Sequence, residues 1–176
     1  MFDKQYRFKG EHARRVDQLT SVFDEISKAK LFERNIDVYV NAPLVGFLYG
    51  RSAPLDSLKN PETGQVYDQN IFGDRVIQSS NELLFNFRLI MLLDSQYEKD
   101  KEKRIDKAFR HMGKDPSDEE HYDGYVRGGV DVLYEKLIIG SNEPEDYVVK
   151  LYDFIEEFDE RFNRKIDIDQ LFELIN

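Results

Sequence analysis

Apolar residues recur at spacings of three and four along most of the chain, which is the period of an amphipathic helix. In residues 11–32 this spacing predicts one helix with a buried stripe at Val16, Leu19, Val22, Phe23 and Ile26. Residues 35–51 alternate like a strand at first, yet a helical stripe also fits them, formed by Ile36, Val40, Leu44, Phe47 and Leu48. We favour a helix there. Pro43 either kinks this helix or lies in the first turn of a shorter helix capped by Asn41.

A long loop and the most apolar segment follow. Gly50 can end the preceding helix in a left-handed conformation, and residues 51–70 have the glycine and proline content of a surface loop. Residues 71–96 contain the most apolar stretch, which predicts the central helix of the domain. We expect Arg88, within that stretch, to meet a carboxylate of the same domain. The alternative is that it faces a cleft and binds an anionic group.

The second half of the chain predicts further helices. A short helix reaches Met112 and ends at Gly113, and the next spans residues 118–139, with Ser117 as its cap and Glu120 completing a capping box. Three glycines inside it indicate close helix contact or a kink, at positions Gly124, Gly128 and Gly129. Asn142 and Glu145 repeat the capping pattern before a helix whose predicted buried stripe contains Val148, Leu151, Tyr152, Ile155, Phe158 and Phe162. A last helix opens at Asp167.

These patterns predict an all-α fold, a single compact domain over residues 1–176 with six or seven helices around the central helix at about 71–96. The chain is 40% hydrophobic and lacks cysteine, which excludes disulfides, thiolate zinc sites, iron–sulfur clusters and cysteine nucleophiles. The first ten residues do not resemble a signal peptide, and no apolar run reaches the length of a bilayer span. We therefore expect a cytoplasmic protein without membrane contact.

The net charge of −10 disfavours nucleic-acid binding as the main activity. Acidity concentrates in residues 141–176, with 11 acidic against 4 basic side chains. A local basic patch remains at the N-terminus, formed by Lys4, Arg7, Lys9, Arg14 and Arg15. This patch is either a solvated helix with a lead-in strand or arm, or the contact surface of a DNA-associated regulator.

The usual catalytic signatures are missing from the sequence. It contains no P-loop, GxGxxG, GxSxG or HExxH pattern. His111, His121 and Asp123 would form a metal site if the intervening loop folded back, although helix capping already explains the neighbouring acids. We assign no catalytic residue and expect no cofactor. A metal-dependent phosphodiesterase or nuclease stays open as one alternative, and the chain is more plausibly not an enzyme.

The segment FERNIDVYVNAPLVGFLYGRSAPLD, Phe32 to Asp56, is the most distinctive in the chain. It resembles the opening of small uncharacterised bacterial proteins associated with phosphorothioate DNA-modification (Dnd-type) defence loci. In those proteins an apolar helix ends in a GF or GY pair followed by a basic residue and Pro-Leu; Pro43 stands where that pattern prefers alanine. The resemblance implies an accessory role in a bacterial DNA-modification or anti-phage system, and it supplies no catalytic residues.

The leading function hypothesis is a non-catalytic protein-interaction subunit or adaptor. The chain has 13 Phe and 10 Tyr, and aromatic residues beyond the needs of a core populate interfaces. The candidate interaction residues are Tyr49, Arg51 and Leu55 at the GFLYGR corner and its loop, with Arg14 and Arg15 serving the DNA-regulator alternative. In the opposing interpretation Tyr49 closes the edge of the core and Arg51 pairs with a carboxylate of the acidic C-terminal region. The oligomeric state and the identity of the partner stay open.

Overall fold

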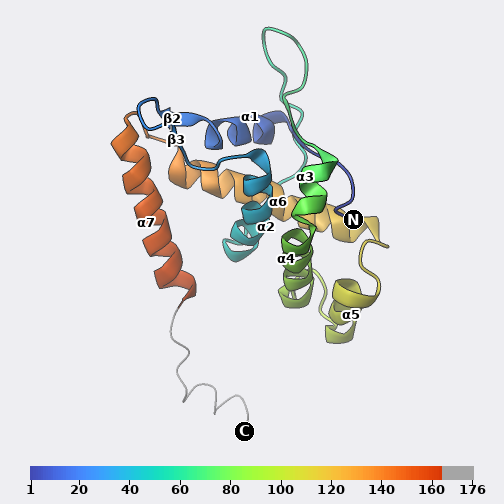
Figure 1. Cartoon of the computed structure of the whole chain (residues 1–176). Helices are drawn as coiled ribbons and strands as arrows, with labels where there is room; N and C mark the ends of the chain where they lie inside the picture. The colour runs from blue at the N-terminus through green and yellow to red at the C-terminus, as the bar shows by residue number, and fades with distance from the viewer. Residues whose placement is uncertain (164–176) are drawn as a thin grey trace.

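The computed structural model describes residues 1–163, and within them the chain is mostly helical (Figure 1). Seven α-helices are found in these residues: α1 (Gly10–Leu19), α2 (Asn35–Leu48), α3 (Gly73–Gln78), α4 (Ser80–Leu93), α5 (Lys101–Ile105), α6 (Pro116–Leu137) and α7 (Pro144–Phe162). A π-helical turn, η1 (Asp106–Arg110), continues α5. No described helix is both long enough and apolar enough to cross a bilayer.

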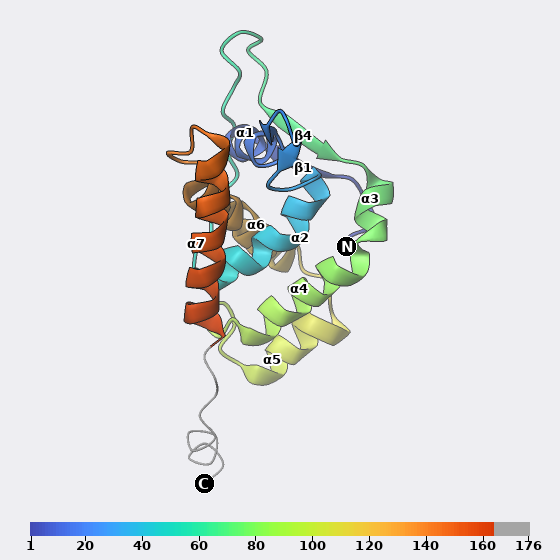
Figure 2. The ribbon, with the colours of Figure 1, turned by 60° about the vertical axis from the view of Figure 1, so that its left-hand side comes forward.

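Two small antiparallel sheets correct the prediction of a purely α-helical fold. Strand β1 (Tyr6–Lys9) pairs with β4 (Asp68–Ile71), so that Tyr6 lies opposite Ile71 (Figure 2). Strands β2 (Val22–Asp24) and β3 (Ala29–Lys30) form a short hairpin. The β1–β4 sheet joins two segments that are far apart in the chain. A local pattern of apolar residues does not predict such pairing.

The helix predicted over residues 11–32 is too long, because α1 ends at Leu19. The Thr20 hydroxyl donates to the carbonyl of Val16 at 2.9 Å, and the Ser21 hydroxyl donates to that of Asp17 at 2.6 Å. The Val16 carbonyl also accepts from the Thr20 backbone N, whereas the Ser21 backbone N turns to Gln18 and leaves the Asp17 carbonyl to the Ser21 hydroxyl. The chain then enters the β2–β3 hairpin, at whose turn Ile26 is 97% exposed rather than buried.

The crossing of α2 and α6 forms the centre of the molecule (Figure 1). A Cβ atom on Gly46 of α2 would overlap the carbonyl oxygen of Tyr125, and one on Gly129 of α6 would overlap that of Ala42. The prediction that the α6 glycines mark close helix contact or a kink is therefore confirmed as helix contact at Gly129. Around the crossing lie fully buried side chains from both helices, among them Val38, Ala42, Val126, Val130 and Leu133.

The segment at 71–96 is not the central helix, which corrects that prediction. It divides at Ser79 into α3 and α4, and α4 buries one face, formed by Leu83, Phe87, Ile90 and Met91. Phe85, on the other face, is 62% exposed, and Leu84 is half-buried. The carboxylate partner predicted for Arg88 is not found within residues 1–163. Its guanidinium lies over the Phe109 ring at 5.3 Å instead, and its Nε is buried without a hydrogen bond among these residues.

Helix α7 packs against α6 and β2 and contributes no fully buried residue, so its predicted core role is also wrong. Tyr147 stacks on Phe23 of β2 with ring centroids 4.9 Å apart, and Phe154 stacks on Tyr49 at 6.2 Å. Four residues of the stripe expected to be buried, from Val148 to Ile155, are exposed instead, with Ile155 at 58%, whereas Phe158 and Phe162 are half-buried. Leu151, expected in the core, is 38% exposed.

The observed capping residues of α6 and α7 lie one or two positions from the predicted ones. Asp115, not Ser117, caps α6, and it accepts from the Ser117 backbone N at 2.9 Å. Glu143 and Asp146, not Asn142 and Glu145, form the capping box of α7. The predicted helix ends are confirmed by left-handed glycines with positive φ angles, at Gly50, Gly113 and Gly140. The helix predicted from Asp167 lies outside the described residues.

Candidate functional site

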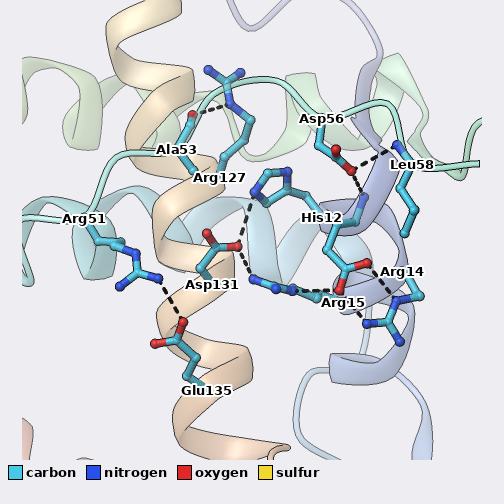
Figure 3. Close-up of polar contacts among 11 residues, drawn as sticks. His12, Arg14, Arg15, Arg51, Ala53, Asp56, Leu58, Arg127, Asp131 and Glu135 are labelled. Carbon is cyan, nitrogen blue, oxygen red and sulfur yellow. Dashed lines mark hydrogen bonds and ion pairs between the residues drawn. The ribbon is translucent and has the colours of Figure 1, made fainter.

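A buried ion pair joins α1 to α6 at the centre of a polar cluster (Figure 3). Arg15 Nη1 donates to Asp131 Oδ1 at 2.5 Å, and His12 Nε2 lies 3.2 Å from the same oxygen. His12 and Asp131 are both nearly inaccessible to water. Burial opposes ionisation of Asp131, but hydrogen bonds and charge from His12 and Arg15 outweigh it and lower the pKa of the carboxyl.

The N-terminus of α1 binds the long loop through Asp56. The Asp56 carboxylate accepts from the backbone N of Glu11 and, at 3.1 Å, from that of Leu58. These backbone hydrogen bonds lower the pKa of Asp56, and the bond from Glu11 has the largest effect. Gly10 permits this approach because its φ is +56° and a Cβ there would overlap Asp56. The contact fixes the loop after α2 over the start of α1.

The segment after α2 lies directly on α6. A Cβ on Gly128 would overlap the backbone of Arg51, and one on Gly124 would crowd the Ser52 hydroxyl. Arg127 Nε donates to the Ala53 carbonyl at 2.8 Å, which holds the segment down (Figure 3). The close approach of this segment therefore explains why α6 has glycine at these two positions, since any side chain there would collide with it.

The predicted basic residues are brought together but are neutralised by acids. Arg51 Nη2 donates to Glu135 at 2.9 Å, one turn of α6 after Asp131 (Figure 3). Arg14 Nε donates to Glu11 Oε2 at 2.9 Å, and Arg15 bonds Glu11 as well as Asp131. Arg7 and Lys9 both pair with Asp68 of β4. Arg7, Lys9, Arg15 and Arg51 therefore connect different elements of the fold, whereas the bond from Arg14 stays within α1.

Tyr49 packs against α7. Its hydroxyl donates to Glu157 at 3.2 Å, and the Arg161 guanidinium lies 4.6 Å from its ring centroid. Partial burial, together with the Glu157 charge, raises the pKa of Tyr49 to about 12. The carboxylate that pairs with Arg51 is Glu135 of α6, which lies before the acidic C-terminal region. Leu55, on the loop, is 67% exposed.

Sequence reasoning missed a surface of exposed apolar side chains on α7. We call it the α7 face, and it consists of Val148, Val149, Leu151, Tyr152 and Ile155. Beside it lies a hollow of about 290 Å³ between α7 and α2, lined by Val45, Ile155 and Phe158. A second hollow of about 380 Å³ between α2 and α4 adjoins it at Asn41 and is lined by Leu44 and Phe85. The signal was present as an amphipathic stripe, but a stripe alone does not say whether another element covers it.

The residues considered for a metal site have other surroundings. His121 Nε2 lies 2.8 Å from Asp94 Oδ2, which also accepts from the Tyr125 hydroxyl at 2.7 Å. The His121 ring stacks on Tyr97 with centroids 3.8 Å apart. His111 is exposed, and Asp123 lines a hollow near the N-terminus. Within residues 1–163 no group of three or more His, Asp or Glu side chains has the arrangement of a metal site.

Comparisons of the chain with protein families, with curated proteins and with solved structures find no match.

Proposed function

We propose that this chain is a non-catalytic adaptor that binds a protein partner through the α7 face. The observation that carries the proposal is the outward orientation of an amphipathic helix: Val148, Tyr152 and Ile155 are 59%, 65% and 58% exposed. Contiguous exposed apolar residues of this kind mark interaction sites in soluble proteins. Full burial of such a side chain contributes about 1.5–3 kcal/mol, so a partner that covers part of several side chains gains substantial free energy.

The charges beside the α7 face select the partner's chemistry. Asp153, Glu156 and Glu160 are exposed and follow one edge of the helix at spacings of three and four. Asp159 lines the adjoining hollow between α7 and α2. An amphipathic helix with a matching apolar stripe and a lysine- or arginine-rich edge is therefore the complementary partner.

The setting we propose for this adaptor is the cytoplasm of a bacterium, in a DNA-modification or anti-phage system. The resemblance of residues 32–56 to proteins of Dnd-type loci supports it. The ion pairs of Arg14, Arg15 and Arg51 favour a protein partner over DNA, because cations already bonded to carboxylates release fewer counterions from phosphates. A DNA-associated regulator is the second candidate, and it rests on the basic N-terminal segment.

Site-specific photocrosslinking identifies what covers the α7 face. A benzophenone side chain replaces Val149 in the full chain, and the adducts are mapped by mass spectrometry. We expect an adduct to a basic amphipathic helix of another protein. An adduct to residues 164–176 of the same molecule, or to a second copy of the chain, would overturn the adaptor proposal because the face would then be covered by this protein itself.

Titration with the identified helix as a synthetic peptide then measures the affinity. The double variant Val148→Asp/Ile155→Asp should weaken binding about tenfold or more, which corresponds to about 1.4 kcal/mol. Ile26→Asp is the control, since it places an aspartate on an exposed isoleucine outside the face, with one added charge against two in the double variant. Equal affinities for the control and the double variant would contradict the proposal.

A further inference from the structure

The N-terminal segment covers a hollow of about 200 Å³ that no part of the proposed function uses. We call it the N-terminal hollow; it is lined by residues 1–6 together with Tyr39 of α2, Val76 of α3, and Glu119, Tyr122 and Asp123 of α6. Four aromatic rings surround it. Phe2 lies edge-on to Tyr122 with centroids 5.7 Å apart, and Tyr6 stacks on Tyr39 at 4.0 Å.

Two polar groups of the hollow have no partner among the described residues. The Tyr122 hydroxyl is buried without a hydrogen bond, although the residue is only 1% exposed. No hydrogen bond to the neighbouring Asp123 carboxylate is found within residues 1–163 either, and burial raises the pKa of that carboxyl to about 7 despite the nearby charge of Arg127. A buried polar group without a bond costs about 1–3 kcal/mol, so the Tyr122 hydroxyl, unbonded beside a hollow and next to the half-buried Asp123 carboxylate, indicates a ligand.

The charge of the lining favours a cation. Asp3, Glu119 and Asp123 contribute three carboxylates, against the exposed ammonium of Lys4 and the terminal amino group, which lies 3.6 Å from Asp3. Aromatic faces add to this preference, because the ring quadrupole attracts a cation by about 0.5–2 kcal/mol per contact. An anion would meet carboxylates and ring faces, and both repel it.

We propose that the N-terminal hollow binds a small protonated amine. Its N–H groups donate to the Asp123 carboxylate and to the Tyr122 hydroxyl oxygen, and its alkyl part packs on the rings of Phe2 and Tyr39. A quaternary ammonium ion has no N–H group, so it leaves both acceptors unsatisfied. The volume lies below the roughly 300–1,000 Å³ of pockets for drug-sized ligands, which limits the ligand to a short alkyl chain.

The proposal is tested on the full chain by NMR titration with n-butylammonium. The amide signals of Tyr122 and Asp123 should shift with saturation, whereas n-butanol and tetramethylammonium should bind about tenfold more weakly or worse. The neutral alcohol tests the need for charge, and the quaternary ion tests the need for N–H donors. Failure of butylammonium to saturate, or equal binding of the alcohol, would overturn the proposal.

Two variants separate a ligand site from a structural one. Asp123→Asn should lower the butylammonium affinity about tenfold or more while the protein stays folded, and Tyr122→Phe should lower it several-fold. Asp153→Asn, which removes an exposed carboxylate on α7, is the control and should bind as the parent does. Unchanged affinity in both Asp123→Asn and Tyr122→Phe would show that the amine binds elsewhere, which contradicts the assignment.

Discussion

Arg15 and Asp131 are separated by 116 residues in the chain, yet their side chains form a 2.5 Å ion pair that fastens α1 onto α6. The side chains are only 22% and 11% exposed. Removal of one partner from such a pair leaves an uncompensated charge away from water, whereas replacement of both by apolar groups does not.

Asp131→Ala should therefore cost about 3–5 kcal/mol of unfolding free energy, measured by urea denaturation. The double variant Arg15→Met/Asp131→Leu should cost less than this single change. His12 also faces Asp131, so it is left unchanged in both proteins. If the double variant is as unstable as Asp131→Ala, the cost comes from lost packing and not from the loss of one of the two carboxylate partners of Arg15.

Gly129→Ala should destabilise the protein by about 3 kcal/mol or more, because the new methyl group would overlap the carbonyl of Ala42 at the α2–α6 crossing. Gly73→Ala is the matched control. A Cβ there would meet its nearest neighbour at 3.4 Å, which is ordinary contact, and its effect should lie near zero. Thermal unfolding measures both, and similar melting temperatures for the two variants would contradict the tight crossing.

Leu151→Ala should cost less than about 1 kcal/mol, since this side chain is 38% exposed on the α7 face. Leu133→Ala, at a position of α6 that is 2% exposed, should cost about 2–5 kcal/mol. Chemical denaturation of the two variants compares the outer helix with the core. A large loss at Leu151 would mean that the α7 face is covered in solution.

Asp123 should make the protein less stable as the pH rises. Its pKa is about 7 in the folded chain, above the ordinary value of 3.8, so the folded state holds this proton more tightly than the unfolded state. Protonated Asp123 therefore contributes its full stabilisation of the folded state below about pH 4. This stabilisation, about 4 kcal/mol at most, is lost as the pH rises through 7. The charges that act on Asp123 are those of Arg127, Glu120 and Glu119.

Asp123→Asn removes this titration. The variant should be more stable than the parent at pH 8, and the two proteins should converge in stability near pH 4. Urea denaturation across this pH range measures the difference. Parallel curves for the two proteins would show that Asp123 ionises without penalty.

Local sequence determined much of the secondary structure. The apolar stripe that begins at Ile36 predicted α2 in spite of Pro43, and Gly50, Gly113 and Gly140 marked helix ends with positive φ angles. Gly129 of α6 correctly indicated close helix contact, whereas Gly124 and Gly128 face the segment after α2. These features depend on the dihedral preferences and hydrogen bonds of a few neighbouring residues, and such preferences are present in the sequence itself.

Tertiary structure alone decided which helix is central and which apolar face is covered. The stripe of α7 has the same pattern as a buried one, but its exposure depends on where α6 and β2 lie. Arginines 14, 15 and 51 were recognisable as candidates, whereas their carboxylate partners were not, since Glu135 lies 84 residues from Arg51. Contacts of this kind form when packing elsewhere in the fold offsets the entropic cost of bringing distant parts of the chain together. No short window of sequence therefore specifies them.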